Sequence, residues 1–320
     1  MTSRSLAVKE IFGLSPWSKS LREASLALRG DRFTPKSRFG VSSLHILRPR
    51  LSLETWAGRA RRDGLIPIYN LFNHTQTAAE RGWSVKVTQV RDFRGGRLTY
   101  DSHNGTDFAV PVGTVVVAAA PGRVARVSSE FNRGGLKVLI DHGEGLLTSS
   151  NHLGRALVQC GDMVQRGQPI ALSGASGIDM LLMFPWSVPH VHFNVWLDGE
   201  LVDPFAMEGQ VSLWQNGNAP VPGNGPNLSD EYITPTQFDE TAVESAIDAC
   251  LDERLQRELI HSSEPGVDVL FHYNVSPTRF ARRPRLVRVE TPRRPRLDLP
   301  FRAEDFRGIF LPPVEGTANA

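Results

Sequence analysis

Two short segments, about ninety residues apart, carry the residue types of a metal site. His103 and Asp107 place an imidazole and a carboxylate four residues apart, and His190 and His192 lie two residues apart. On a β-strand, residues i and i+2 point to the same face, so both imidazoles of the second pair can reach one point. A catalytic zinc ion takes three protein ligands of the His, Asp or Glu type and leaves one position open for water. Two histidines and one aspartate would supply such a ligand set.

The chemistry of such a site would be hydrolysis, because zinc lowers the pKa of a bound water and polarises a carbonyl group. Neither pattern is specific by itself. H-x-x-x-D and H-x-H pairs also occur by chance among surface or hydrogen-bonded histidines, and a motif becomes informative only when its surroundings agree.

The surroundings of both segments form an ordered series of motifs. They read His103-Asn104-Gly105-Thr106-Asp107 (H-x-G-x-D), Phe108-Ala109-Val110-Pro111-Val112-Gly113-Thr114, Pro121-Gly122-Arg123-Val124, Leu139-Ile140-Asp141-His142-Gly143, Thr148 to Leu153 with His152, Gly161-Asp162-Met163-Val164, Gly174-Ala175-Ser176-Gly177 and Val202-Asp203-Pro204. In this order the chain resembles the lysostaphin-like (LytM-type) zinc metallopeptidases, many of which cut peptidoglycan cross-bridges. The resemblance covers residues 83–206.

The resemblance implies a zinc metalloendopeptidase that hydrolyses peptide bonds, in peptidoglycan or related peptides, with a metal-activated water. It implies that His103, Asp107 and His192 bind one zinc ion (Zn2+) per chain. His152 and His190 would be catalytic without binding the metal: one would help to deprotonate the attacking water, and the pair would hydrogen-bond the developing oxyanion.

Two positions depart from the family's pattern. Ser150 stands where the family's motif "T-x-Y-x-H-L" has tyrosine. The short segment that precedes H-x-H in the family is replaced here by the longer apolar stretch 178–189. This stretch is either core packing or one wall of the substrate groove, and we favour the wall because loops beside a site usually set specificity.

The alternative function is a non-catalytic lysostaphin-like module that binds or regulates cell-wall hydrolases, as some relatives that lack metal ligands do. Ligand loss would distinguish the two. All five positions are filled here, which favours the enzyme; fold alone does not decide function.

The elements that must position these residues are short strands. Period-2 alternation over 83–88, 136–142 and 190–197, with apolar runs at 115–120 and 170–172, predicts a mainly β fold with an antiparallel sheet. We expect a peptidase domain at 83–206 between an N-terminal extension of unknown role (1–82) and a linker (207–235).

The extensions are expected to be partly helical. Apolar spacing predicts short helices over 18–28 and 51–62 and one helix over 243–255, within a C-terminal extension at 236–320. The Arg/Pro-rich stretch 279–297 has too many prolines for a helix and should be extended.

Composition excludes few partners. The net charge is +2, although residues 1–62 hold thirteen Lys/Arg against four acids. The basic segments could bind an anionic partner, but solvated charge is the simpler interpretation. The absence of interleaved aromatic residues argues against nucleic acid as that partner. Cys160 and Cys250 lack metal-ligand spacing and are expected to be buried, although one disulfide stays open.

Localisation is left open by the sequence. The N-terminus has no apolar signal segment, and no window approaches a membrane span, which by themselves predict a cytoplasmic protein. The family resemblance points instead to the cell envelope or to export. The oligomeric state is likewise open.

Overall fold

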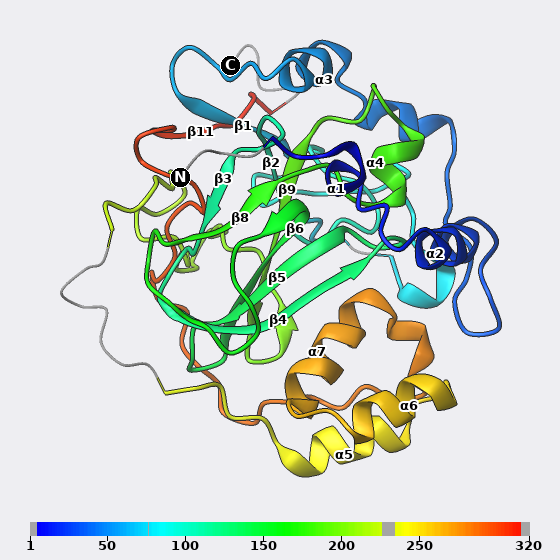
Figure 1. Ribbon diagram of the computed structural model, residues 1–320. Helices are drawn as coiled ribbons and strands as arrows, with labels where there is room; N and C mark the ends of the chain where they lie inside the picture. The colour runs from blue at the N-terminus through cyan, green and yellow to red at the C-terminus, as the bar shows by residue number, and fades with distance from the viewer. Residues whose placement is uncertain (1–4, 76, 226–233, 315–320) are drawn as a thin grey trace.

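A mostly antiparallel β-sheet forms the centre of the molecule, a computed structural model that describes residues 5–75, 77–225 and 234–314 (Figure 1). The strand order is β11-β1-β2-β9-β6-β5-β4-β7, with β10 beside β9 and β8 joining β3 to β6. Among the described strands, β1 and β11 form the only parallel pair. The strands are β1 (Leu65–Asn70), β2 (Thr106–Ala109), β3 (Val115–Val117), β4 (Gly122–Glu130), β5 (Gly135–Asp141), β6 (Leu146–Ala156), β7 (Met163–Val164), β8 (Pro169–Ser173), β9 (His190–Leu197), β10 (Glu200–Leu201) and β11 (Gly308–Phe310). The predicted mainly β fold class is confirmed.

The two faces of the sheet are set by the alternation along β9. Val191 and Phe193 lie in the larger hydrophobic core, whereas Trp196 packs in a second cluster on the opposite face. His190 and His192 share the face of Trp196, because residues two apart on a strand point the same way. The histidines therefore belong to the face that the second cluster covers.

The larger core draws on segments outside residues 83–206. Six fully or nearly fully buried side chains from later in the chain pack into it: Leu213, Trp214, Leu297, Leu299, Phe301 and Phe306. Single bridges hold these segments to each other and to the sheet, as between residues 214 and 297 and between 116 and 301. Of the predicted linker, residues 226–233 lie outside the described part of the chain.

Three helices cover the opposite face of the sheet (Figure 1, yellow to orange): α5 (Glu240–Asp248), α6 (Glu253–Ile260) and α7 (Pro265–Val275). The prediction of one helix over 243–255 is wrong, because the chain turns between α5 and α6. The Asp252 side chain accepts hydrogen bonds from the amides of Arg254 and Leu255 and so starts a new helix. In this turn, the backbone of Cys250 forms an isolated β-bridge with Phe280, which follows η3.

Short helices of the N-terminal region lie along the sheet's edge and its upper end in Figure 1: α1 (Val8–Ile11), α2 (Trp17–Arg29), η1 (Val41–Ile46), α3 (Pro49–Trp56) and η2 (Ala79–Arg81). The helix predicted at 18–28 is confirmed, and the one predicted at 51–62 is confirmed only as far as Trp56. Glu10 ties α1 to β6 through an ion pair with Arg155 at 2.8 Å.

Two smaller expectations are wrong. Residues 83–88 form no strand and make only a bridge between Arg38 and Ser84. Ser84, rather than Trp83 or Val85, is the buried residue, because its hydroxyl donates to Asp101 at 3.0 Å. Cys160 is exposed in the turn before β7, and both cysteines are free.

The remaining elements are α4 (Ile178–Leu182) and η3 (Pro277–Arg279). Beyond η3 the Arg/Pro-rich stretch forms no helix, as predicted, and contains only isolated bridges at Phe280 and Leu297. Within the part of the chain that the structure describes, no helix has the length and apolarity needed to span a bilayer.

Candidate metal centre

Neighbouring strands bring the two histidine segments together. Asp107 on β2 is paired with His192 on β9, and His192 is also paired with Asn151 on β6. His103 reaches the same point from the loop before β2. Gly105 makes this approach possible, since a Cβ there would lie 2.7 Å from Nε2 of His192 and 2.6 Å from the carbonyl oxygen of Phe193.

Three potential ligand atoms meet in a tight triangle. Nε2 of His103 lies 3.0 Å from Oδ1 of Asp107 and 3.2 Å from Nδ1 of His192, and Nδ1 of His192 lies 2.8 Å from the same Oδ1. Ligand atoms of a tetrahedral zinc ion lie about 3.3 Å apart. The residues His103, Asp107 and His192 form a buried group that could hold a metal ion.

The protonation pattern of the triangle favours a cation. Nδ1 of His103 donates to the carbonyl oxygen of Leu71 at 2.6 Å, so in the neutral ring Nε2 carries a lone pair. That lone pair faces the carboxylate of Asp107, which is also an acceptor. His192 can donate a single proton from Nδ1, too few for all three contacts. A positive charge at this point, either a metal ion or a proton on Nε2 of His103, resolves this excess of acceptors.

Burial and charge keep the group ready to bind metal. Burial by itself would raise the pKa of the Asp107 carboxyl, but the neighbouring His103 and His190 imidazoles hold it well below its ordinary value. Burial lowers the pKa of His192, although its hydrogen bond to Asp107 acts in the opposite direction. Metal binding requires an ionised carboxylate and neutral imidazoles, and the shifts of Asp107 and His192 are in these directions.

His152 and His190 lie beside the triangle. Their ring centres are 4.6 Å apart, and Nε2 of His190 lies 3.5 Å from Oδ1 of Asp107. His152 has a left-handed backbone conformation, with φ of 59°, in an irregular part of β6. Such a conformation is costly for a residue with a Cβ, and residues of this kind concentrate at functional sites.

Backbone carbonyls fix the tautomers of both rings. Nδ1 of His152 donates to the carbonyl oxygen of Ser176, and Nδ1 of His190 donates to that of Val188, each at 2.7 Å. Their Nε2 atoms therefore carry lone pairs in the neutral rings. Burial lowers the pKa of His152 to about 4, so this ring is neutral near pH 7 and can accept a proton.

Several supporting residues have no signature in the sequence. Asn70 on β1 donates from Nδ2 to Oδ2 of Asp107 at 2.8 Å and so fixes the carboxylate. Asn194 donates to the carbonyl oxygen of Asn104 at 2.8 Å, and Asn104 donates to Oδ1 of Asn274 on α7 at 2.6 Å. The sequence offers one indication of these residues: Asn194 follows His192 by two positions and therefore lies on the same face of the strand.

Comparison with known proteins assigns this region to a family. Residues 101–204 match the model of Peptidase family M23. An uncharacterized metalloprotease from Haemophilus influenzae is 36% identical over 106 residues, which are 33% of this chain and 21% of that protein. Peptidoglycan DD-endopeptidase ShyB from Vibrio cholerae is 40% identical over 111 residues, which are 35% of this chain and 24% of that protein.

Residues 101–204 belong to peptidase family M23. The lysostaphin-like resemblance is thereby confirmed. This chain spans only about a fifth to a quarter of the length of the two curated relatives. Among solved structures, the catalytic domain of lysostaphin from Staphylococcus simulans is 28% identical, with a TM-score of 0.29 over 32% of this chain and 77% of that chain.

The apolar stretch 178–189 of the M23 domain contributes both to the core and to the wall of the pocket beside the metal centre. Ile178 and Met180 are buried, whereas Leu182 and Phe184 are about half exposed. Ile178, Asp179 and Leu182 also line the pocket that contains His152 and His192. The carboxylate of Asp179 lies 3.8 Å from Nε2 of His152, so the stretch forms part of the pocket wall.

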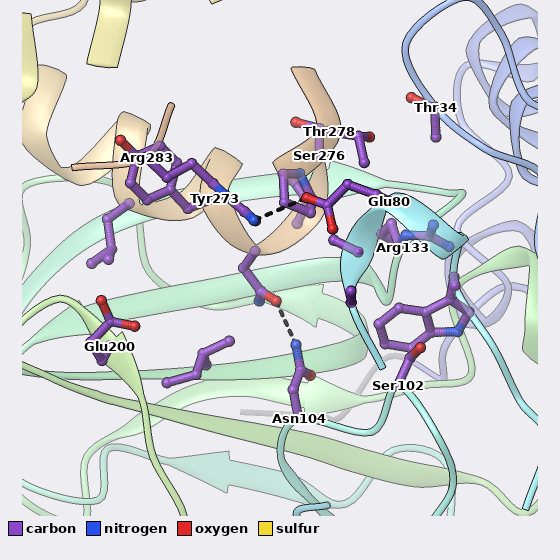
Figure 2. Close-up of a pocket in the computed structure, with 18 of the residues that line it drawn as sticks. Thr34, Glu80, Ser102, Asn104, Arg133, Glu200, Tyr273, Ser276, Thr278 and Arg283 are labelled. Carbon is purple, nitrogen blue, oxygen red and sulfur yellow. Dashed lines mark hydrogen bonds and ion pairs between the residues drawn. The ribbon is translucent and has the colours of Figure 1, made fainter. Parts of the chain in front are cut away.

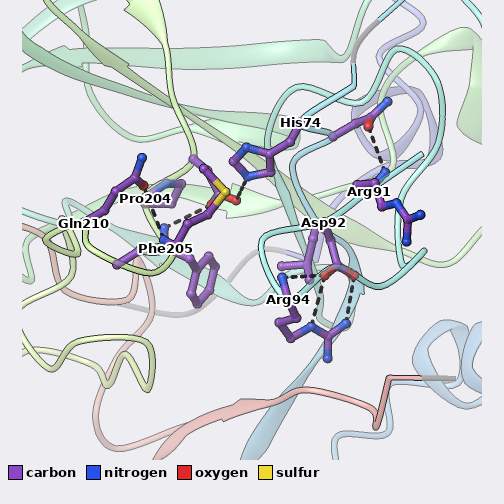
Figure 3. A network of polar contacts seen from close by, with 12 residues as sticks. His74, Arg91, Asp92, Arg94, Pro204, Phe205 and Gln210 are labelled. Atoms are coloured by element: carbon purple, nitrogen blue, oxygen red, sulfur yellow. Dashed lines mark hydrogen bonds and ion pairs between the residues drawn. The ribbon is translucent and has the colours of Figure 1, made fainter. Parts of the chain in front are cut away.

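The closing motif of the M23 domain has a structural role (Figure 3). Oδ2 of Asp203 lies 2.8 Å from Nε2 of His74, and its Oδ1 accepts a hydrogen bond from the amide of Phe205. Nearby, Asp92 and Arg94 form an ion pair at 3.0 Å. These contacts hold the loop after β1 against residues 203–205, and β1 carries Asn70.

Proposed function

We propose that this protein is a zinc metalloendopeptidase that hydrolyses peptide bonds. His103, Asp107 and His192 would hold one zinc ion. The observation that carries the proposal is the triangle of ligand atoms 2.8–3.2 Å apart, formed by two imidazole nitrogens and one carboxylate oxygen. Membership of an M23 peptidase family supports it.

When bound, zinc supplies a lowered pKa for water and polarisation of the scissile carbonyl. The chain's own residues do the rest. His152 is neutral near pH 7 and offers Nε2 as the acceptor for a proton of the attacking water. Nε2 of His190, once protonated, would donate a hydrogen bond to the oxyanion that develops on the substrate.

Peptidoglycan peptides are the proposed substrate class. The support is the name of a relative, a peptidoglycan DD-endopeptidase that is 40% identical over the matched residues. The M23 domain is the shared part, so the bond that is cut depends on this chain's own groove. The apolar stretch 178–189 and the two extensions build that groove.

Metal content and hydrolysis test the proposal together. We expect about one zinc ion per chain by mass spectrometry of the metal, and release of peptide fragments from purified peptidoglycan that stops with a chelator. His103→Ala should lose both the zinc and the activity. The exposed His261 on α6 provides the matched control, and His261→Ala should keep both. A folded protein that binds no zinc and cuts neither peptidoglycan nor a peptide library would refute the proposal.

Because the site is buried, a second function is also considered: a module that binds or regulates cell-wall hydrolases. The side chains of His103, Asp107 and His192 are 0%, 2% and 11% exposed. Zinc binding without hydrolysis, combined with stimulation of a separate cell-wall hydrolase, would favour this candidate. Hydrolysis by the purified chain would exclude it as the sole function.

A further inference from the structure

A cavity of about 570 Å³ opens beside the metal centre (Figure 2). Its walls come from residues 77–83 of the N-terminal region, from α7 and the segment 276–286, and from the turn between β9 and β10. The pocket that contains His152 and His192 shares five of its lining residues: Trp83, Asn104, Arg133, Asn274 and Val275. The two hollows are therefore neighbours with a common boundary.

Arg133 stands on this boundary, in the turn between β4 and β5. Its guanidinium carbon lies 4.9 Å from the centre of the Trp83 ring, and Nη1 donates to the carbonyl oxygen of Asn132 at a long 3.4 Å. In the ranges that the structure describes, Arg133 forms no ion pair: no carboxylate oxygen lies within 4.0 Å of its side-chain nitrogens. Stacking on Trp83 holds the plane of the guanidinium and leaves its edge for other partners.

The other cations around the two hollows are already paired. Lys137 lies 2.8 Å from Glu130, and Arg283 lies 3.2 Å from Glu80 on the far wall of the cavity (Figure 2). Burial lowers the pKa of Arg133 to about 10, although attraction from Asp179 opposes this. Arg133 is only partly exposed, and a charge that is partly withdrawn from water without an ionic partner favours binding of an opposite charge.

Building on the proposed peptidase activity, we propose that Arg133 binds a carboxylate of the peptide substrate where the metal-site pocket meets the larger cavity. The guanidinium presents donors in a planar fork that matches the two oxygens of a carboxylate. The substrate class is thus a peptide with a carboxylate close to the scissile bond. The carboxylate belongs either to a free C-terminus or to an acidic side chain.

Paired peptides distinguish the two sources of the carboxylate. One pair of tetrapeptides has blocked ends and carries Glu or Gln; the other pair has no acidic side chain and ends in a carboxylate or a carboxamide. Binding to the full-length protein is measured by calorimetry in the presence of a chelator, so that hydrolysis cannot interfere. We expect one carboxylate peptide to bind about 10- to 100-fold more tightly than its amide partner, the usual range for a hydrogen bond to a charged group.

Variants assign that preference to one side chain. Arg133→Gln should remove it while leaving the amide peptide unchanged, and Arg133→Lys should keep part of it. Arg285→Gln is the matched control, because Arg285 lies outside both linings and pairs with Glu290. Equal loss of binding for both members of a pair would assign Arg133 a structural role and overturn the proposal, as would the absence of any preference in the unmodified protein.

Hydrolysis by the zinc-loaded protein then separates this inference from the proposed function. We expect Arg133→Gln to raise KM for the carboxylate peptide and to leave kcat nearly unchanged. A carboxylate preference in binding without cleavage of any peptide would contradict the peptidase activity and leave the binding site standing. Cleavage that is indifferent to the carboxylate would contradict the binding site alone.

Discussion

Hydrogen bonds to the two ring nitrogens separate the histidines of this protein into those that support the fold and those available for chemistry. His142 uses both nitrogens within the fold, with Nδ1 beside the carbonyl oxygen of Pro121 and Nε2 beside the hydroxyl of Thr148, each at 2.8 Å. His152 and His190 each commit Nδ1 to a backbone carbonyl. Their Nε2 atoms stay near the centre, whereas both ring nitrogens of His142 are engaged within the fold.

Acid should destabilise the protein through His142. Burial lowers its pKa to about 4 from an ordinary 6.5, so between these values the unfolded chain binds a proton that the folded chain does not. The free energy of unfolding therefore falls as the pH drops from 6.5 to 4, by about 3 kcal/mol for this one group. Above pH 6.5 the contribution is complete and constant.

Urea unfolding at pH 7.5 and pH 4.5, with chelator present, measures this effect. His142→Gln should show a smaller loss of unfolding free energy between the two pH values than the unmodified protein, by about 2–3 kcal/mol. His261→Gln, at an exposed position, should retain the full loss. Identical pH dependence in all three proteins would contradict the assignment to His142.

Strand β1 shows how an element without any motif completes the centre. It lies in the region that the sequence assigned to an N-terminal extension, and it pairs with β2 so that Asn70 is opposite Asp107.

Asn70→Ala should weaken zinc binding about 10- to 100-fold, because partners that orient a metal ligand have effects of this size. Competition with a chromogenic chelator measures the affinity. Asn216→Ala, at an exposed turn, is the control, and equal affinities would show that Asp107 needs no such support.

Sequence alone could predict those elements whose information is local. The alternation around His190 and His192 predicts β9, and the order of motifs predicts the antiparallel sheet of the M23 domain. Asn70 could not be found, because its partner is 37 residues away and no spacing rule links them. The break between α5 and α6 was missed because the apolar spacing continues through it, while the cap at Asp252 depends on one side chain.

At the scale of the whole molecule, the C-terminal helices pack against one face of the sheet, and the alternation along β9 places His190 and His192 on that same face. Asn104, inside the first metal motif, is hydrogen-bonded to Asn274 on α7. The cavity beside the centre is walled on one side by α7 and on another by residues 77–83. The regions that flank the M23 domain in sequence therefore line the cavity beside the metal centre.

The larger core gives the strongest test of this integration, because residues beyond the motifs fill it. Trp214 is fully buried against Phe193, with ring centres 5.7 Å apart, and Phe108 and Phe205 also contact it. Trp214→Ala should lower the free energy of unfolding by about 3–5 kcal/mol, the cost of emptying such a site. Trp214→Phe should cost less than half as much, since it keeps a ring there and removes an indole N–H that has no hydrogen-bond partner in the described residues. Urea unfolding measures both. A loss below about 1 kcal/mol for Trp214→Ala would instead mark residues 207–225 as a linker that the M23 domain does not need for folding.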